Sequence, residues 1–332
     1  MAEDAVHRVS IAGTDTTFEV ADGERILSAA LRAGVWMPFE CGWGSCGTCK
    51  MTLVEGEVAT LFADAPAISP RDARRSRIVA CQTTPTSDLV VKPTWVEPGP
   101  REGLATERRP AVLTERVEIG PAIFRLRFLL DEPVEFFEGQ HAVIDLGDDL
   151  RRCYSMSNRP GSAEVEFIMK RYPGRIGSET VAALNAGAAV FLEMPYGDMW
   201  IRDSAGPLCL VAGGTGIAPI LGMLRRLAAE RDPRPVRVLY GANIRDELVC
   251  WQELADLIAA LPDGELVGAL SAPPAGWSGV NGLVTHALEP MLAALAGADF
   301  YIAGPPPMTN AVTAQLKDAG IQLDRIRYDS FG

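Results

Sequence analysis

Four of the seven cysteines have a spacing that suits a metal centre. Cys41, Cys46 and Cys49 share one short, glycine-containing segment, and Cys81 follows after 31 further residues. A C-x4-C-x2-C…C spacing can hold a two-iron, two-sulfide cluster through four thiolates. The intervening glycines let the backbone wrap closely and turn N–H groups toward cluster sulfurs. The sequence therefore predicts a 2Fe–2S cluster on these four residues.

Structural zinc, disulfide bonds and buried thiols are the competing interpretations of this pattern. Zinc sites usually combine two short cysteine spacings, whereas Cys81 stands alone. Disulfides are not expected, because the acidic start of the chain shows no export signal. The remaining cysteines are scattered in apolar surroundings and are expected to be buried small side chains: Cys153, Cys209 and Cys250.

A polar motif in the middle third has the residue types to bind a phosphate and a flat ring. It reads Arg152-Cys153-Tyr154-Ser155 and falls on a predicted strand, where Arg152 and Tyr154 share one face. A guanidinium can clamp a phosphate while an aromatic ring covers a heterocycle. Downstream, Gly177 and Ser178 lie at an expected helix start, where backbone N–H groups bind phosphate.

A glycine turn in the last third predicts a dinucleotide site. The turn follows a buried strand at 208–212 and precedes a helix that carries Ile217, Ile220, Leu221 and Leu224 on one face. A pyrophosphate can approach such a turn and meet the positive end of the helix. Further glycines follow strands at 236–240 and 300–303, and parallel strands bind ligands at these ends. The candidate nucleotide-binding residues are Gly213, Gly214, Thr215, Gly216, Pro219, Gly304 and Pro305.

The elements around these motifs change character along the chain. The first third begins with short strands near residues 9–11 and 18–20, followed by a helix expected to begin near Asp22 and to end at Gly34. The middle third has strand-like runs at 124–130, 142–146, 164–170 and 189–193, a spacing typical of a barrel or sandwich. The last third alternates strands with helices, which indicates a parallel sheet.

We therefore expect three domains, at residues 1–99, 100–204 and 205–332. A proline- and glycine-rich linker is expected at about residues 93–110.

Composition excludes several classes of function. The 332 residues carry a net charge of −12, which disfavours binding to nucleic acid or to anionic membranes. Residues 204–224 carry no charge, but the glycine turn and Pro219 argue against a membrane span. With no export signal visible, a cytoplasmic protein is expected.

The first third resembles the plant-type ferredoxin domain, through Pro38, the three-cysteine segment and Ala80-Cys81-Gln82. The other two thirds resemble the flavin and nicotinamide domains of the ferredoxin–NADP reductase superfamily. The resemblance implies a multidomain α+β fold: a β-grasp ferredoxin domain, an antiparallel β-barrel FAD domain and a doubly wound α/β NAD domain. It also makes the four cysteines the cluster ligands.

The same resemblance assigns roles in flavin binding. Arg152 would hold the flavin pyrophosphate, Tyr154 would pack on the isoalloxazine, and Ser155 would hydrogen-bond near its N5. Gly177 and Ser178 would bind phosphate, although Arg175 departs from the glycine often found in that loop.

The nicotinamide domain departs from its relatives in two places. Ala303 stands where a cysteine commonly precedes the Gly-Pro-Pro run, which predicts an altered rate of hydride transfer. Ser271-Ala272-Pro273 lacks the arginine that binds the 2′-phosphate in NADPH-specific relatives, so NADH is the expected cofactor.

The domain order resembles the NADH-dependent reductase components of bacterial multicomponent oxygenases. A ferredoxin domain at the N-terminus points to FAD rather than FMN. Electrons would pass from NADH through FAD to the 2Fe–2S cluster, and then to a terminal oxygenase or a separate ferredoxin that docks transiently near Trp43 and Gly44. Alternatives are a redox-sensing module or a free-standing NADH oxidase without a dedicated partner.

Overall fold

A computed structural model describes residues 6–35, 37–39, 42, 44, 46–63, 65–94, 106–147 and 150–331. The chain divides into two compact units. The first comprises Met1–Arg109, Val143–Cys153 and Phe191–Tyr196; the second comprises Pro110–Ala142, Tyr154–Val190 and Gly197–Gly332. The predicted division at residues 99 and 204 stays a prediction.

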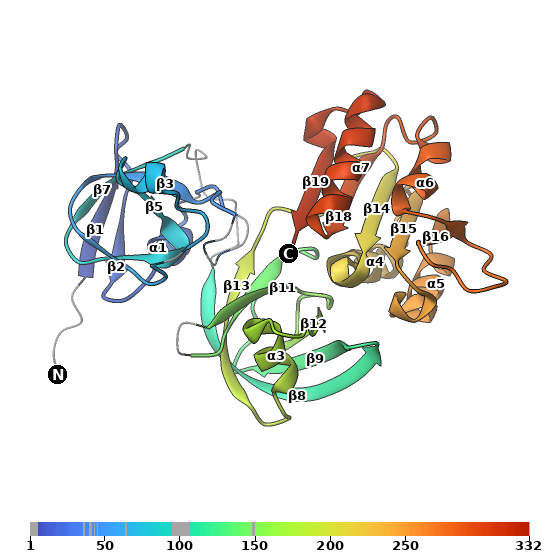
Figure 1. The fold of residues 1–332 in the computed structure, drawn as a ribbon, viewed down its shortest axis with the longest axis horizontal. Coiled ribbons are helices and arrows are strands. Elements are labelled where there is room, and N and C mark those ends of the chain that lie inside the picture. Colours follow the sequence, from blue (N-terminus) through green and yellow to red (C-terminus); the bar gives the residue numbers. More distant parts are fainter. Residues whose placement is uncertain are drawn as a thin grey trace. The chain divides into compact units, whose positions relative to one another are not determined.

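A mixed five-stranded sheet and one helix form the ferredoxin-like part of the first unit, as a β-grasp fold requires (Figure 1). The order is β2-β1-β7-β3-β5, with β1 antiparallel to β2 and parallel to β7. Alternating apolar residues of these strands share a core with helix α1. The bounds are β1 Val6–Ile11, β2 Thr17–Ala21, α1 Ile26–Arg32, β3 Lys50–Glu55, β4 Val58–Thr60, α2 Pro70–Ala73, β5 Arg77–Val79, β6 Thr83–Pro85 and β7 Leu89–Pro93.

The N-cap of helix α1 lies three residues later than predicted. Asp22 does not cap it; the N-cap is Arg25, which makes no side-chain cap bond. The carboxylate of Glu24 instead accepts the N–H of Ala21, and the N–H of Glu24 bonds to the carbonyl of Ala21. These bonds hold residues 21–24 in a local turn, so a helix cannot begin at Asp22. The predicted end at Gly34 is confirmed, with φ of 72°.

The flavin-domain region forms a second sheet in the order β11-β10-β13-β8-β9-β12. An antiparallel bridge between Met156, just after β11, and Phe167 of β12 closes this sheet into a barrel. The predicted strands are confirmed, and the sequence missed β8, which starts inside the predicted linker. The bounds are β8 Glu107–Gly120, β9 Ile123–Leu130, β10 His141–Asp145, β11 Arg151–Ser155, β12 Glu164–Lys170, α3 Ile176–Ala183 and β13 Ala189–Tyr196.

The last third is a parallel sheet in the order β17-β16-β15-β14-β18-β19. Helices α4 and α5 share one apolar core with the sheet, and α6 and α7 share another, so both faces are covered (Figure 1). The strand order reverses beside β14, where doubly wound sheets bind ligands. The bounds are β14 Leu208–Gly213, α4 Ile217–Glu230, β15 Val236–Ala242, α5 Trp251–Ala259, β16 Gly264–Leu270, β17 Val280–Asn281, α6 Val284–Leu288, β18 Asp299–Gly304, α7 Pro306–Asp318 and β19 Ile326–Ser330.

The uncharged stretch at 204–224 folds as predicted into a buried strand, a glycine turn and the first half of α4. None of the helices in the described ranges is long and apolar enough to span a bilayer.

Candidate functional site

The cysteine segment precedes β3, and Cys81 lies in a short 3-10 turn after β5. Because β3 and β5 are antiparallel neighbours, the two ends meet, and the sulfurs of Cys49 and Cys81 lie 3.3 Å apart. Two thiolates on one tetrahedral metal with 2.3 Å bonds would lie about 3.8 Å apart. Both side chains are buried, whereas Cys46 is exposed and accepts the N–H of Thr48 at 3.5 Å.

The sulfurs of Cys49 and Cys81 are close enough to bind one iron of a cluster together. Cys41, the fourth predicted ligand, lies outside the described residues, as does Trp43. Among the residues that are described, no group of three or more metal-binding side chains forms. The geometry therefore supports two of the four predicted ligands as a pair and leaves Cys41 and Cys46 as predictions.

Strand β11 carries Arg152 in the first unit. Its neighbour Arg151 is buried and donates to Glu193 at 2.5 Å. Since adjacent residues of a strand point to opposite faces, Arg152 faces the other way. Arg152 is half-buried and donates to the carbonyl of Arg151 at 2.6 Å. Its contact with the flavin pyrophosphate stays a prediction.

The next residues of β11 belong to the second unit. The ring of Tyr154 is half-buried, with its centroid 6.4 Å from that of Phe167. The hydroxyl of Ser155 donates to a carboxylate oxygen of Asp329 on β19 at 3.1 Å. Burial raises the pKa of Asp329, against smaller opposing effects of His141 and of the Ser155 hydrogen bond. A carboxyl group that readily keeps a proton therefore lies beside the serine expected near the flavin N5.

The predicted phosphate loop leads into α3. Arg175 is the N-cap and makes no side-chain cap bond, so backbone N–H groups of the first turn are available to an anion. The hydroxyl of Ser178 is used within the loop, where it accepts the N–H of Tyr172 at 3.0 Å and lies 3.1 Å from the carbonyl oxygen of Arg175. Gly177 is buried. The arrangement fits phosphate binding by backbone groups more than by the Ser178 side chain.

The nucleotide turn is held tightly between two strands. A side chain on Gly216 would overlap the carbonyl oxygen of Ala303 on β18, so the α4 N-terminus can approach that strand only with glycine. Gly213 and Gly304 approach each other in the same way, with both facing Met308 of α7. The turn at 213–216 and the segment after β18 thus form one cradle, and its binding of a nucleotide stays a prediction.

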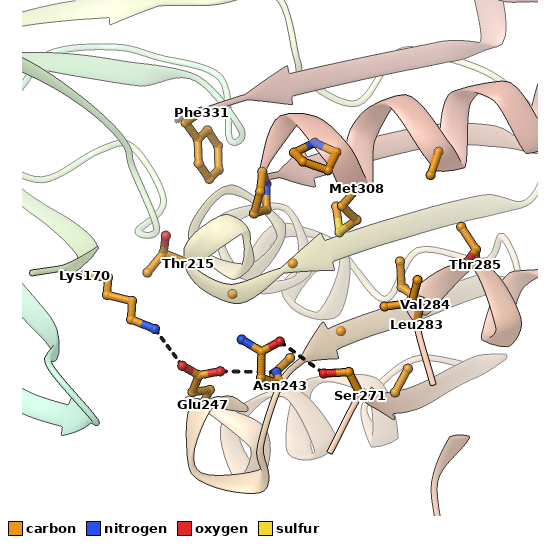
Figure 2. A pocket seen from close by; sticks show the side chains of 18 of the residues that line it. Lys170, Thr215, Asn243, Glu247, Ser271, Leu283, Val284, Thr285, Met308 and Phe331 are labelled. Atoms are coloured by element: carbon orange, nitrogen blue, oxygen red, sulfur yellow. Dashed lines mark hydrogen bonds and ion pairs between the residues drawn. The ribbon is translucent and has the colours of Figure 1, made fainter. Parts of the chain in front are cut away.

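A cavity of about 350 Å³ opens along this cradle at the carboxyl ends of the parallel strands (Figure 2). Its size and position suit a dinucleotide. Pro219 lies in the first turn of α4, is buried and does not line the cavity. Of the other candidate nucleotide-binding residues, those that line it are Gly213, Gly214, Thr215 and Pro305, whereas Gly216 and Gly304 do not. Ser271 lines it as well.

Two opposite charges line the cavity and bind each other. The ammonium of Lys170, at the end of β12, lies 2.6 Å from the carboxylate of Glu247 (Figure 2). Burial alone would raise the pKa of Glu247, but Lys170 and Asn243 outweigh it and hold this pKa below its ordinary value. Further along, the hydroxyl of Ser271 donates to the side-chain carbonyl of Asn243 at 3.1 Å.

Sequence reasoning missed Lys170, Glu247, Asp329 and Phe331 as parts of these sites. Phe331, beyond the last strand, lines the nucleotide cavity. Each of them is an isolated polar or aromatic residue without a recurring spacing. A signal existed for Asp329 and Phe331 only in their place at the carboxyl end of the final strand of a parallel sheet, an end that binds ligands.

Three family models match the chain in succession. Residues 9–86 match a 2Fe–2S iron–sulfur cluster binding domain. Residues 110–200 match an oxidoreductase FAD-binding domain, and residues 210–314 match an oxidoreductase NAD-binding domain. Fold and matches together define an iron–sulfur flavoprotein oxidoreductase with a nicotinamide site.

Relatives extend this likeness over the whole chain. The ferredoxin–NAD(+) reductase component of the alkene monooxygenase system of Xanthobacter autotrophicus is 36% identical, over 95% of this chain and 98% of the relative. The reductase component of phenol 2-monooxygenase of a Pseudomonas species is 35% identical, over 93% and 90%. The ferredoxin reductase in carbazole 1,9a-dioxygenase is a solved structure with TM-score 0.88, 27% identity and full coverage of both chains. The chain belongs to the family of reductase components of oxygenase systems.

Proposed function

We propose that this protein passes electrons from NADH through FAD to its 2Fe–2S cluster and on to a terminal oxygenase or a separate ferredoxin. The observation that carries the proposal is the succession of iron–sulfur, FAD and NAD domains in one chain, matched end to end by reductases of oxygenase systems. FAD, when bound, accepts hydride as an electron pair and can release electrons singly to an iron–sulfur centre. We expect it to act in the cytoplasm, where thiols stay reduced.

The chain's own residues would bind and orient the reactants. The turn at 213–216 and Pro305 would hold the pyrophosphate of NADH against the N-terminus of α4. Arg152, Tyr154, Ser155 and the start of α3 would hold the flavin. Asp329 would hold or accept a proton at its carboxyl, next to the Ser155 hydroxyl. Ala303, fully buried on β18, would leave the nicotinamide without the sulfur that relatives commonly place there.

The cofactor content of the purified protein and the reduction of its cofactors by NADH together test the proposal. The purified protein should contain FAD and about two irons with two sulfides per chain. NADH should reduce the flavin and then the cluster, which is followed by their separate absorption changes. One zinc without acid-labile sulfide would overturn the cluster assignment. A loaded cluster that NADH cannot reduce would favour a redox-sensing module instead.

A further inference from the structure

Helix α4 links the predicted nucleotide turn with the segment that follows the predicted flavin contacts Tyr154 and Ser155. It begins at the nucleotide turn, and Gly222 lies six residues further on, about 9 Å along the axis. There it faces the backbone that follows β11. A methyl group on Gly222 would lie 3.3 to 3.4 Å from the carbonyl oxygens of Met156, Ser157 and Asn158, tighter than an ordinary contact. The nucleotide helix thus rests on the segment directly after Tyr154 and Ser155.

Arg225, one turn beyond Gly222, ties the same two elements by hydrogen bonds. Its guanidinium donates to the carbonyl of Ser157 at 2.9 Å and to the carboxylate of Glu166 on β12 at 2.8 Å. The other side of the fork binds Glu253 of α5 at 2.5 Å. A planar guanidinium can serve three acceptors in fixed directions, which a lysine ammonium cannot do equally well.

The network around Arg225 centres on the buried carboxylate of Glu166. The side chain of Glu166 is 3% exposed, accepts the Ser157 hydroxyl at 2.8 Å and also binds Arg127 at 3.0 Å. Burial would raise the pKa of Glu166, but Arg225 and the Ser157 hydroxyl outweigh it and keep this pKa below its ordinary value. Arg125 of β9 completes the link by binding Glu253 at 2.9 Å. These pairs resist sliding of one element past the other, because Glu166 would lose its partner in a buried place.

We propose that Gly222 and Arg225 are positioning residues that set the distance between the nicotinamide and the flavin. This inference rests on the proposed function. Hydride transfer needs donor and acceptor atoms about 3 to 3.5 Å apart, and small misplacements cost large factors in rate. A helix is stiff along its axis, so a displacement at Gly222 moves the turn at 213–216 with it.

Gly222→Ala tests the close approach. Alanine favours helix over glycine, so without the contact this change would be harmless or stabilising. With the contact, α4 must move away by a few tenths of an ångström. We expect the limiting rate of flavin reduction by NADH in the loaded protein to fall roughly tenfold. The dissociation constant for NAD+, measured by equilibrium titration, should change less than about twofold, since the turn itself is intact.

Arg225→Lys is a second, independent test, because it removes the planar guanidinium and keeps the positive charge. It should slow flavin reduction with the same small change in NAD+ affinity. Arg231→Lys is the matched control, because Arg231 is the exposed C-cap residue of the same helix and should leave the rate unchanged. If Gly222→Ala does not fold, Arg225→Lys decides.

Wild-type rates of flavin reduction in folded Gly222→Ala and in Arg225→Lys would overturn the proposal. So would a loss of NAD+ affinity as large as the loss of rate, because the variants would then damage the nucleotide site. If NADH cannot reduce the bound flavin of the wild-type protein, the proposed function itself would be wrong.

Discussion

At the scale of single residues, the lysine that lines the nucleotide cavity is paired with a glutamate that also lines it. Lys170 and Glu247 are the charged side chains among its described lining residues, and they bind each other. The additional 2′-phosphate of NADPH needs a positive partner, and Ser271-Ala272-Pro273 supplies none. The geometry thus adds a second reason to expect a preference for NADH.

Glu247→Gln should weaken that preference. The change removes the carboxylate that holds Lys170 and leaves the ammonium available to an extra phosphate. We expect kcat/KM for NADPH to rise relative to NADH by roughly fivefold, about 1 kcal/mol for a partly exposed pair. Asp246→Asn is the control, since Asp246 is exposed next to Glu247 and does not line the cavity. An unchanged ratio in Glu247→Gln would show that Lys170 cannot reach the phosphate.

Asp329 predicts a pH dependence of stability. Because its pKa is raised in the folded chain, its ionised form costs stability at pH values above the folded pKa. That cost declines as pH falls through the folded pKa, when the native state takes up a proton before the unfolded state. Asp329→Asn should therefore raise the urea midpoint of unfolding most at alkaline pH, and the gain should shrink as the pH is lowered. The exposed Asp324 provides the control Asp324→Asn. A gain that is constant with pH would contradict this account.

Residues with a fixed spacing were predictable, and isolated contacts were not. The cysteines and the turn at 213–216 have a pattern that their chemistry dictates, so the sequence alone could predict them, and the cysteines stay a predicted ligand set. Ser155 was named through its strand, but its partner Asp329 lies 174 residues away. Only the folded parallel sheet, with β19 at its edge, brings the two together.

At the scale of elements, the strongly periodic segments followed the sequence and the irregular ones did not. The buried strand at 208–212 and the inward face of α4 are where the apolar pattern placed them. Strand β8 was missed because Pro110 and many charged residues lie within it, and because its pairing with β9 shifts register twice. The sequence predicts the start of α1 too early because Asp22 is a residue type that favours helix N-caps. In the structure, Glu24 stabilises a turn at this place instead.

The βα turn makes a sharp prediction at this scale. In Gly216→Ala, the new methyl group meets the carbonyl oxygen of Ala303, which belongs to a central strand and cannot move aside. We expect a loss of about 1 to 3 kcal/mol in stability and at least a tenfold weaker binding of NAD+, measured by thermal unfolding and by calorimetry. Gly297→Ala is the matched control, because a methyl group there meets nothing within 4 Å. Equal NAD+ binding by both variants would mean that the turn does not hold the pyrophosphate.

At the scale of the whole molecule, the ferredoxin-like sheet and the parallel sheet have separate apolar cores. The core under the ferredoxin-like sheet lies wholly in the first unit, and the two cores of the parallel sheet lie wholly in the second. Damage to the cluster should therefore leave the nucleotide domain folded. This separation makes the order of electron flow testable by mutation.

Cys46→Ser should impair the reduction of cytochrome c and leave the reduction of ferricyanide intact. Thiolates are the usual ligands of these clusters, so the exposed Cys46 should be needed for a stable one. Ferricyanide can take electrons directly from reduced flavin, and its reduction by NADH should persist. Reduction of cytochrome c, which we expect to pass mainly through the cluster, should fall at least tenfold. Tyr154→Ala or Arg152→Ala should impair both activities, because the flavin precedes both exits.

Cys250→Ser provides the matched control for that experiment. Cys250 lies outside the cluster sequence and accepts a hydrogen bond from Arg125 at 3.0 Å, which a serine oxygen can also accept. Both activities should survive this change, so a selective loss in Cys46→Ser would be specific to the cluster. If Cys46→Ser kept full cytochrome c reduction, electrons would leave from the flavin itself. The cluster would then not be the exit, and a relay to an oxygenase through it would have to be abandoned.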